Sequence, residues 1–392
     1  MRKMTPPCKH NSDVPTRAVY AHVPFCRARC RYCDFYSVPA PTGLLASRYV
    51  RGIVRELAQT QDQYAAPLGS VFIGGGTPTA LPADLLGTLL GAFAPLCDAD
   101  TEFTLEANPG TISDTAVAQL LAGGVNRVSL GAQSFIPEEL ELLGRIHTAS
   151  QIAEAVTTLR SAGIGNLSLD LIFGIPGQTA ASWARSLDEA LALEPDHLSC
   201  YALSMPAGTA LARMLDNGEI TAVDDDLQRE FYDQAVETLE RAGLAQYEIS
   251  NFARPGKQCK HNLVYWHNQS YVGLGPSAAS YCAGVRRTTT AEVHAWLQAV
   301  EADTPPPAES EALTGRDMLA ETAMLTLRLV AGIDRKAFRQ RFGEDIVEAF
   351  PRTFTRYAAL GAVEITDDAV RIAQASLFVA NAVLADLLDE IA

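Results

Sequence analysis

The sequence predicts an α/β protein with a large parallel sheet, followed by a smaller helical module. Three observations support this. The chain has 392 residues, which is too long for one small domain, and 48% of them are hydrophobic, so a substantial core can be buried. From about Ala18 to Tyr201, short β-branched or aromatic runs alternate with longer helical patterns. Beyond Tyr201 this alternation stops.

Six runs in the first part are predicted to be strands, with helix-like stretches such as Leu45–Asp62 and Gln151–Ala162 between them. Alternation at about 30-residue spacing indicates right-handed βαβ units and a parallel sheet. Six units are fewer than the eight of a closed barrel, so an open barrel and a doubly wound sheet both fit. The predicted strands are Ala18–Val23, Ser70–Ile73, Glu102–Glu106, Arg127–Leu130, Asn166–Ile172 and His197–Tyr201.

The second part begins with a predicted amphipathic helix, Asp224–Arg241, which has an acidic start and a glycine stop. Residues 247–281 are rich in Gly, Asn and aromatic side chains, and Glu301–Glu311, with three consecutive prolines, is predicted to be a linker. Residues 18–300 therefore form the predicted main domain. Residues 313–392 are predicted to be helices around a hairpin at Ala362–Ile372, typical of a winged-helix-like domain.

Charge and composition exclude several classes of protein. A net charge of −15 disfavours a nucleic-acid-binding protein, which needs a basic face. Residues 1–17 are predicted to be a flexible polar tail, because no apolar stretch follows their basic residues as in a secretory signal. Eight cysteines are too few for a disulfide scaffold. We therefore expect a cytoplasmic protein in which the clustered cysteines bind metal.

The clustered cysteines are Cys26, Cys30 and Cys33, spaced C-x3-C-x2-C directly after the first predicted strand. Thiolates are soft ligands that suit iron–sulfur clusters and zinc. Three thiolates leave one iron of a [4Fe–4S] cluster open, where S-adenosylmethionine can bind and be cleaved to a radical by one electron. The alternative is a structural zinc site with a fourth ligand, for which His22, Cys8 and His10 are candidates.

Polar residues and glycines follow the other predicted strands, and the carboxyl ends of parallel strands share one edge of the sheet. Glycines allow close approach of the backbone to a ligand, and carboxylates and amides suit ribose hydroxyls and amino groups. Arg145 can pair with a carboxylate as a bidentate fork. Taken one at a time, the glycines could form a tight turn, Glu106 or Asp170 could cap a helix, and Arg145 could be a surface charge. The candidates are Gly75, Gly76, Thr77, Glu106, Gln133, Arg145, Asp170 and Ala202.

Two stretches carry a family resemblance: Gly74-Gly75-Gly76-Thr77-Pro78 and Tyr20-x-His22-x-Pro24-Phe25-Cys26-x3-Cys30-x-Tyr32-Cys33. Together they resemble the coproporphyrinogen dehydrogenase-like branch of radical S-adenosylmethionine proteins. The resemblance implies a partial (β/α)6 barrel with a C-terminal helical, winged-helix-like domain. It implies that the three cysteines bind the cluster. It also implies that S-adenosylmethionine contacts Tyr20, Tyr32, Gly75, Gly76, Thr77, Glu106, Gln133, Arg145, Asp170 and, more weakly, Ala202.

Two features distinguish groups within this branch. The dehydrogenases have a further cysteine two positions after the third ligand, where this chain has Phe35. The run His261-Asn262-Leu263-Val264-Tyr265-Trp266 matches the H-N-x-x-Y-W signature of the heme-chaperone group. The resemblance therefore implies heme binding and transfer to an acceptor protein, with an electron donor as a further partner. The alternatives are an oxygen-independent coproporphyrinogen III dehydrogenase and a radical enzyme with another substrate.

His261 is the leading candidate for a heme ligand, because imidazole is a common axial ligand of heme iron and Tyr265 and Trp266 offer flat apolar surface. Its alternative role is structural, holding the segment against the barrel. Cys259 is interpreted as a packed thiol. The tetrapeptide Cys259–Asn262 also occurs as Cys8–Asn11, which we interpret as coincidence. A membrane-associated heme acceptor is compatible with the sequence.

Overall fold

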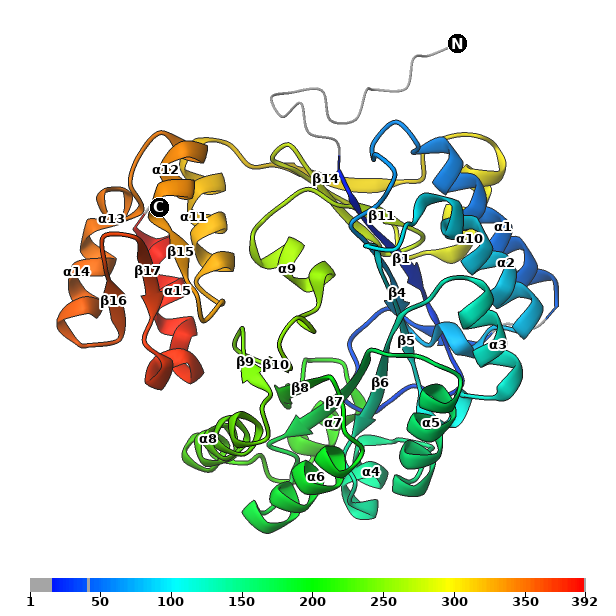
Figure 1. Cartoon of the computed structure of the whole chain (residues 1–392), viewed down its shortest axis with the longest axis horizontal. Helices are drawn as coiled ribbons and strands as arrows, with labels where there is room; N and C mark the ends of the chain where they lie inside the picture. Colours follow the sequence, from blue (N-terminus) through cyan, green and yellow to red (C-terminus); the bar gives the residue numbers. More distant parts are fainter. Residues whose placement is uncertain (1–15, 41–42, 391–392) are drawn as a thin grey trace.

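The computed structural model describes residues 16–40 and 43–390, and its centre is a nine-stranded sheet (Figure 1). Six strands of this sheet lie side by side in chain order and run parallel. A doubly wound sheet would reverse this order at a switch point, so that alternative is wrong. All six predicted strands are confirmed. They are β1 (Ala18–Val23), β4 (Ser70–Gly75), β5 (Glu102–Ala107), β6 (Arg127–Gln133), β7 (Leu167–Phe173) and β8 (His197–Ala202).

The sheet curls but stays open. Strand β11 (Val272–Leu274) pairs in parallel with β1 at one edge. Strands β10 (Asn251–Ala253) and β9 (Ala245–Gln246) extend the other edge, beside β8, in antiparallel orientation. Within residues 16–40 and 43–390, no pairing joins β9 to β11. The prediction of a partial barrel is therefore confirmed.

Helices cover the convex side of the sheet (Figure 1). Helix α1 (Leu44–Gln59) shows why: its residues Tyr49, Val50, Ile53 and Leu57 recur at helical spacing and are all buried against the sheet. Several of these helices begin with side-chain caps, such as the Thr148–Gln151 capping box of α5 (Ala149–Ser161). The helices of this part are α1 (Leu44–Gln59), α2 (Ala83–Phe93), α3 (Asp114–Ala122), α4 (Pro137–Leu143), α5 (Ala149–Ser161), α6 (Ala180–Ala192), α7 (Ala210–Asp216), α8 (Asp225–Arg241) and α10 (Val293–Glu301). Short 3-10 turns occupy Pro78–Ala80, Ala94–Leu96, Pro109–Thr111 and Gln374–Val379.

The segment 247–281 crosses the open side of the barrel from β10 to β11, and its short helix α9 (Lys260–Trp266) lies in the concave interior (Figure 1). The carboxylate of Glu102, at the start of β5, accepts hydrogen bonds from the backbone amides of Lys260 at 3.0 Å and His261 at 3.2 Å. A carboxylate at this position satisfies amides at the first turn of the helix. Helix α9 is thus fixed at the amino-terminal ends of the strands.

The predicted linker Glu301–Glu311 is wrong. Helix α10 ends at Glu301, and Ala308–Ala312 forms β14, the third strand of a sheet with β12 (Ala279–Cys282) and β13 (Val285–Thr289). All five residues of β14 are exposed, so the strand has no apolar alternation that a sequence pattern could reveal. Backbone pairing with β13 defines it.

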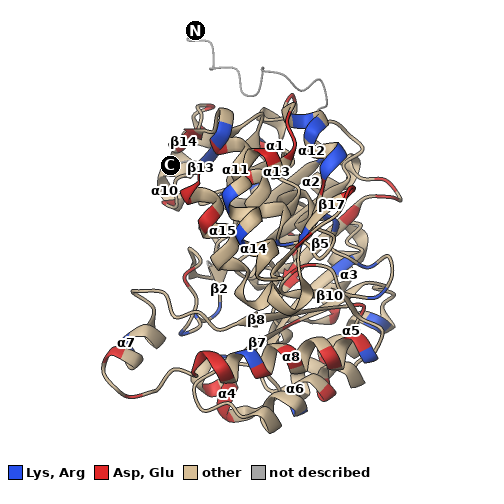
Figure 2. Ribbon diagram, turned by 90° about the vertical axis from the view of Figure 1, so that its left-hand side faces the viewer, with Lys and Arg blue, Asp and Glu red and all other residues tan. Residues whose placement is uncertain are grey.

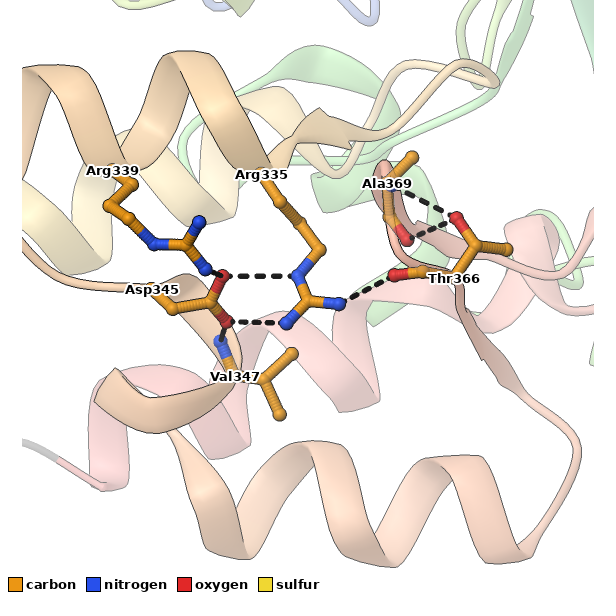
Figure 3. A network of polar contacts seen from close by, with 6 residues as sticks. All are labelled: Arg335, Arg339, Asp345, Val347, Thr366 and Ala369. Carbon is orange, nitrogen blue, oxygen red and sulfur yellow. Dashed lines mark hydrogen bonds and ion pairs between the residues drawn. The ribbon is translucent and has the colours of Figure 1, made fainter.

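The C-terminal part packs helices around a small antiparallel sheet, as the sequence predicts, and its hairpin lies at the predicted place. Figure 3 shows the polar network at its centre: Asp345 accepts two hydrogen bonds from Arg335 at 3.0 Å and one from Arg339 at 2.7 Å. Arg335 also donates to the carbonyl of Thr366 at 2.6 Å, which ties the hairpin to the helices. The elements are α11 (Gly315–Thr326), β15 (Ile333–Asp334), α12 (Arg335–Phe342), α13 (Ile346–Ala349), α14 (Pro351–Ala359), β16 (Val363–Ile365), β17 (Ala369–Ile372) and α15 (Ala380–Asp389).

This C-terminal part faces the open side of the barrel (Figure 1). The Asn268 side chain, just after α9, donates to the Thr322 hydroxyl at 3.0 Å, and the Val330 amide donates to the Tyr247 carbonyl at 3.0 Å. The ribbon of Figure 2 marks positions of basic residues on α12 and of acidic residues along α4 and α8. No helix among the described residues is long and apolar enough to span a bilayer. The predicted tail, apart from residues 16 and 17, lies outside the described residues, as do Cys8 and His10.

Candidate functional site

A cavity of about 470 Å³ opens at the carboxyl ends of the parallel strands. Its walls come from the carboxyl-terminal parts of β4, β5, β6, β7 and β8 and from loops between the elements, including the loop after β1, so residues far apart in sequence converge there. This is the edge at which α/β barrels place functional groups. The predicted site residues that line it are Cys26, Cys30, Tyr32, Cys33, Gly75, Gly76, Thr77, Glu106, Gln133, Arg145, Asp170 and Ala202.

The loop that carries the three cysteines is held by backbone hydrogen bonds on several sides. Residues Phe25–Cys26 (β2) pair with Val38–Pro39 (β3), and the Thr77 amide donates to the Phe25 carbonyl at 2.7 Å. At the far side of the loop, the Arg31 amide donates to the Leu143 carbonyl at 2.9 Å. The Arg31 carbonyl accepts from the Leu211 amide at 2.8 Å. The polypeptide itself therefore positions the thiols.

The thiol groups of Cys26, Cys30 and Cys33 are free and partly exposed toward the cavity. Burial raises the pKa of Cys26, although the Thr77 hydroxyl, 3.7 Å from its sulfur, acts in the opposite direction. Burial likewise raises the pKa of Cys33. A metal that binds here must therefore displace thiol protons, which couples its affinity to pH.

The donor set fits an iron–sulfur cluster. In the described part of the chain, no three His, Cys, Asp or Glu side chains converge as ligands of a single ion. A [4Fe–4S] cluster does not require this convergence, because each thiolate binds a different iron. His22, a candidate fourth zinc ligand, already has both ring nitrogens engaged: Nδ1 lies 2.8 Å from the Tyr20 hydroxyl and Nε2 3.3 Å from the Tyr36 carbonyl. The other candidates, Cys8 and His10, lie outside the described residues.

The glycine run after β4 makes room for protein groups as well as for the cavity. A Cβ on Gly74 would lie 2.6 Å from the carboxyl carbon of Glu106, and a Cβ on Gly76 would lie 2.6 Å from the carbonyl oxygen of Val23. Gly75 adopts a φ of +98°, and its amide donates to Glu106 at 2.8 Å. The glycines were expected to admit a ligand. They also admit the Glu106 carboxylate and the backbone before the cluster loop.

Two buried carboxyl groups form the polar wall. Burial raises the pKa of Glu106 to about 7, against the opposing hydrogen bond from Gly75. Burial also raises the pKa of Asp170, against hydrogen bonds from serine hydroxyls that include Ser129 at 3.1 Å. The pairing of β6 with β7 shifts register between Leu130 and Gln133, and Gln133 has a φ of +68°. This irregularity changes the direction of the strand end that carries the Gln133 side chain. These groups suit the hydroxyls and amine of a polar ligand.

Arg145 joins the polar wall to the cysteine loop. One terminal nitrogen, Nη1, donates to Cys30 Sγ at 3.1 Å. The other, Nη2, donates to Asn108 Oδ1 at 2.7 Å and to the Gly131 carbonyl at 2.6 Å. Its Nε is buried without a hydrogen-bond partner. The predicted bidentate fork toward a ligand carboxylate is thus largely engaged by protein groups.

Tyr20 and His261 do not line the cavity. The Tyr20 hydroxyl is turned to His22, and the Tyr20 ring lies 6.1 Å from the Phe72 ring and 6.4 Å from the His261 ring. His261 is fully buried; its Nδ1 lies 2.9 Å from the Ser70 hydroxyl and its Nε2 2.9 Å from the Tyr265 hydroxyl. In this arrangement no ring nitrogen of His261 is open to a heme iron. The placement favours the structural role, and heme ligation stays a prediction.

Several cavity residues were not predicted. Asn108 lies two positions after Glu106 and binds Arg145, and Ser129 binds Asp170. Ser129 and Gly131 precede Gln133 at two-residue spacing, the period that places strand residues on one face, so this signal was present in the sequence. Tyr201 and Phe35 also line the cavity.

Comparisons with known proteins identify the family of the chain. Residues 20–190 match the model of the Radical SAM superfamily, and residues 313–379 match that of the HemN C-terminal domain. The chain is 32% identical over 382 residues to the heme chaperone HemW of Bacillus subtilis, an alignment that covers 96% of this chain and 100% of that protein. The chain belongs to the HemW family.

Other members and a solved structure extend the comparison. The heme chaperone HemW of Synechocystis is 40% identical, with 82% of this chain and 79% of that protein covered. The structure of the radical SAM enzyme coproporphyrinogen III oxidase (HemN) from Escherichia coli superimposes with a TM-score of 0.81 over 95% of this chain and 90% of that one. At 22% identity, that likeness establishes the shared fold alone. A radical SAM barrel with a HemN-type C-terminal domain is therefore the fold of this HemW family member.

Proposed function

We propose that the chain is a heme chaperone, which binds heme and transfers it to an acceptor protein. In this proposal it depends on a [4Fe–4S] cluster at Cys26, Cys30 and Cys33 and on S-adenosylmethionine. The observation that carries the proposal is the cavity in which three free thiols meet the polar strand-end residues. The printed names of the HemW relatives supply the heme function.

When bound, the cluster supplies one electron and an open iron for the amino and carboxylate groups of S-adenosylmethionine. The residues of the chain hold and orient that ligand. Arg145, which lines the cavity, offers a guanidinium group to an acceptor atom, and Glu106 and Asp170 offer carboxyl oxygens to hydroxyl or amino protons. Because Glu106 has a pKa of about 7, its carboxyl group can accept or donate a hydrogen bond near neutral pH.

Phe35 argues against the alternative, an oxygen-independent coproporphyrinogen III dehydrogenase. The side chain lines the cavity and is 64% exposed, at the position where the dehydrogenase pattern has a cysteine. A phenyl ring can neither ligate a metal nor exchange a proton, and its exposed face suits contact with a flat apolar molecule. We therefore expect the radical SAM site without coproporphyrinogen dehydrogenase activity.

The proposal includes partners that the site requires. A one-electron donor must reduce the cluster, and an acceptor protein must take the heme; a membrane-associated acceptor is compatible with the proposal. We place the protein in the cytoplasm and assign it no nucleic-acid partner. Residues 247–281 remain the proposed heme-associated segment, with residues 18–300 and 313–392 as the two domains.

The test uses anaerobically reconstituted protein with a reductant and S-adenosylmethionine. Heme and coproporphyrinogen III are added to separate samples, and heme absorbance and porphyrinogen products are measured. We expect a stable heme complex and no decarboxylation. Formation of protoporphyrinogen IX would show the dehydrogenase alternative to be right, and absence of heme binding would leave a radical enzyme with another substrate.

A further inference from the structure

A chain of four residues leads from a buried histidine to the sulfur of a cysteine in the cluster loop. His147 is 3% exposed and is not among the residues that line the cavity. Its Nδ1 lies 3.1 Å from Asn108 Oδ1, which accepts from Arg145 Nη2 at 2.7 Å. Arg145 Nη1 then donates to Cys30 Sγ at 3.1 Å. His147 therefore reaches the cysteine only through two intermediates.

The chemistry of the donors fixes the direction of this chain. A guanidinium group only donates, so the oxygen of the Asn108 side chain, not its nitrogen, must face Arg145. The same oxygen faces His147, which can support it only as a donor from Nδ1. A neutral imidazole carries one N–H, so donation from Nδ1 to Asn108 leaves Nε2, which lies 3.0 Å from the carbonyl of Ala132 in β6, without a proton to donate. His147 thus holds Asn108 in the orientation that Arg145 requires.

We infer that His147 is a positioning residue, which fixes the Arg145–Cys30 contact through Asn108 and thereby raises the reduction potential of the cluster. This inference rests on the proposed cluster at Cys26, Cys30 and Cys33. Reduction adds one negative charge to the cluster, and a hydrogen bond from a cation to a ligand sulfur stabilises the more negative form. A change that weakens the hydrogen bond from Arg145 to Cys30 removes that stabilisation and lowers the reduction potential of the cluster.

Two substitutions at one position separate this role from packing. In His147→Asn, the side-chain amide nitrogen lies near the place of Nδ1 and can still donate to Asn108. In His147→Gln, it lies near the place of Nε2 and can reach only the Ala132 carbonyl. Asn108→Ala removes the middle of the chain. His197→Gln is the matched control, because His197 is also fully buried, with ring nitrogens bound to Ser168 and Tyr247 at the opposite end of the barrel.

The experiment is a redox titration of the reconstituted full-length protein, followed by electron paramagnetic resonance of the reduced cluster. We expect His147→Gln and Asn108→Ala to shift the equilibrium about tenfold toward the oxidised cluster, which is about 59 mV for a one-electron couple. We expect His147→Asn and His197→Gln to stay near the wild-type value. The double variant His147→Gln/Asn108→Ala should shift no further than Asn108→Ala, because both changes break one chain.

An unchanged potential in Asn108→Ala and His147→Gln, with the cluster intact, would overturn this inference and leave the proposed function standing. Equal shifts in His147→Gln and His147→Asn would also overturn it, because packing and not the donor would then be responsible. A wild-type protein that assembles no cluster would overturn the proposed function and this inference together.

Discussion

The hydroxyl of Ser70 lies 2.9 Å from Nδ1 of His261, at the amino-terminal ends of the strands and away from the cavity. The Tyr265 hydroxyl engages the other ring nitrogen, and Glu102 holds the backbone at the start of α9. The His261–Trp266 run is therefore held against the inner strands β4 and β5 of the open sheet. In α/β barrels, residues at this end serve stability more often than chemistry.

The substitution His261→Gln is expected to destabilise the fold by about 2–3 kcal/mol, because it breaks two buried hydrogen bonds. The heme absorption spectrum should remain that of the wild-type protein. Denaturant unfolding and titration with heme measure the two effects. His267→Gln, one position after α9 and exposed, is the control. Loss or displacement of the heme band in His261→Gln alone would instead identify His261 as the axial ligand.

The free energies of unfolding of the wild-type protein and of His261→Gln should also differ in their pH dependence. Burial, together with the charge of Arg127, lowers the pKa of His261 to about 3, whereas an unfolded histidine has a pKa of about 6.5. The unfolded state then binds more protons, so the wild-type protein loses this contribution as pH falls below about 6.5. We expect the stability advantage of wild type over His261→Gln to be full above pH 7 and to shrink toward pH 5. Unfolding free energies measured at several pH values test this, and an advantage that grows on acidification would contradict it.

Gly76→Ala should prevent normal assembly of the cluster loop. The added Cβ would lie 2.6–2.8 Å from backbone atoms of Val23 and Phe25, which cannot rotate away as a side chain can. The strand end must then shift, together with the adjoining Cys26. We expect iron and sulfide content after reconstitution to fall several-fold. Gly91→Ala, with no atom within 4 Å of its Cβ, should retain the full content, and equal content in both variants would refute this explanation.

The buried carboxylate of Asp345 should be a main source of stability in the C-terminal part. Burial tends to raise its pKa, but hydrogen bonds from Arg335 and the Val347 amide and the charges of Arg335 and Arg339 outweigh this and lower it. We expect Asp345→Ala to cost about 3 kcal/mol, because it leaves the buried face of Arg335 unpaired. Limited proteolysis should detect the change within residues 313–392. The wild-type contribution should persist above the unfolded pKa of about 3.9 and disappear only at lower pH.

The strands and the strand-end residues could be predicted because their signals are local. Apolar runs at regular spacing marked six strands, and the glycines and polar residues that follow them converge because parallel strands share one edge. The loop from Cys26 to Cys33 was recognisable from spacing alone. These features depend on neighbours in sequence and on the general geometry of parallel sheets.

The remaining features depend on contacts between distant residues. The five exposed residues of β14 form a strand only because β13 pairs with them. Tyr20 was expected at the ligand, but its hydroxyl turns to His22, two residues away on the same strand. The burial of His261 follows from α9 meeting Ser70 and Glu102, about 160 to 190 positions earlier. A motif in the sequence cannot show that its histidine already has partners.

The central claim is that the cavity holds a [4Fe–4S] cluster with one iron open to S-adenosylmethionine. The most direct measurement is the electron paramagnetic resonance spectrum of the reduced, reconstituted protein before and after addition of S-adenosylmethionine. We predict a cluster signal that changes when S-adenosylmethionine is added and that is absent from a folded variant with Cys26, Cys30 and Cys33 replaced by Ala. A wild-type signal that S-adenosylmethionine leaves unchanged, or a triple variant that retains the cluster, would contradict the account.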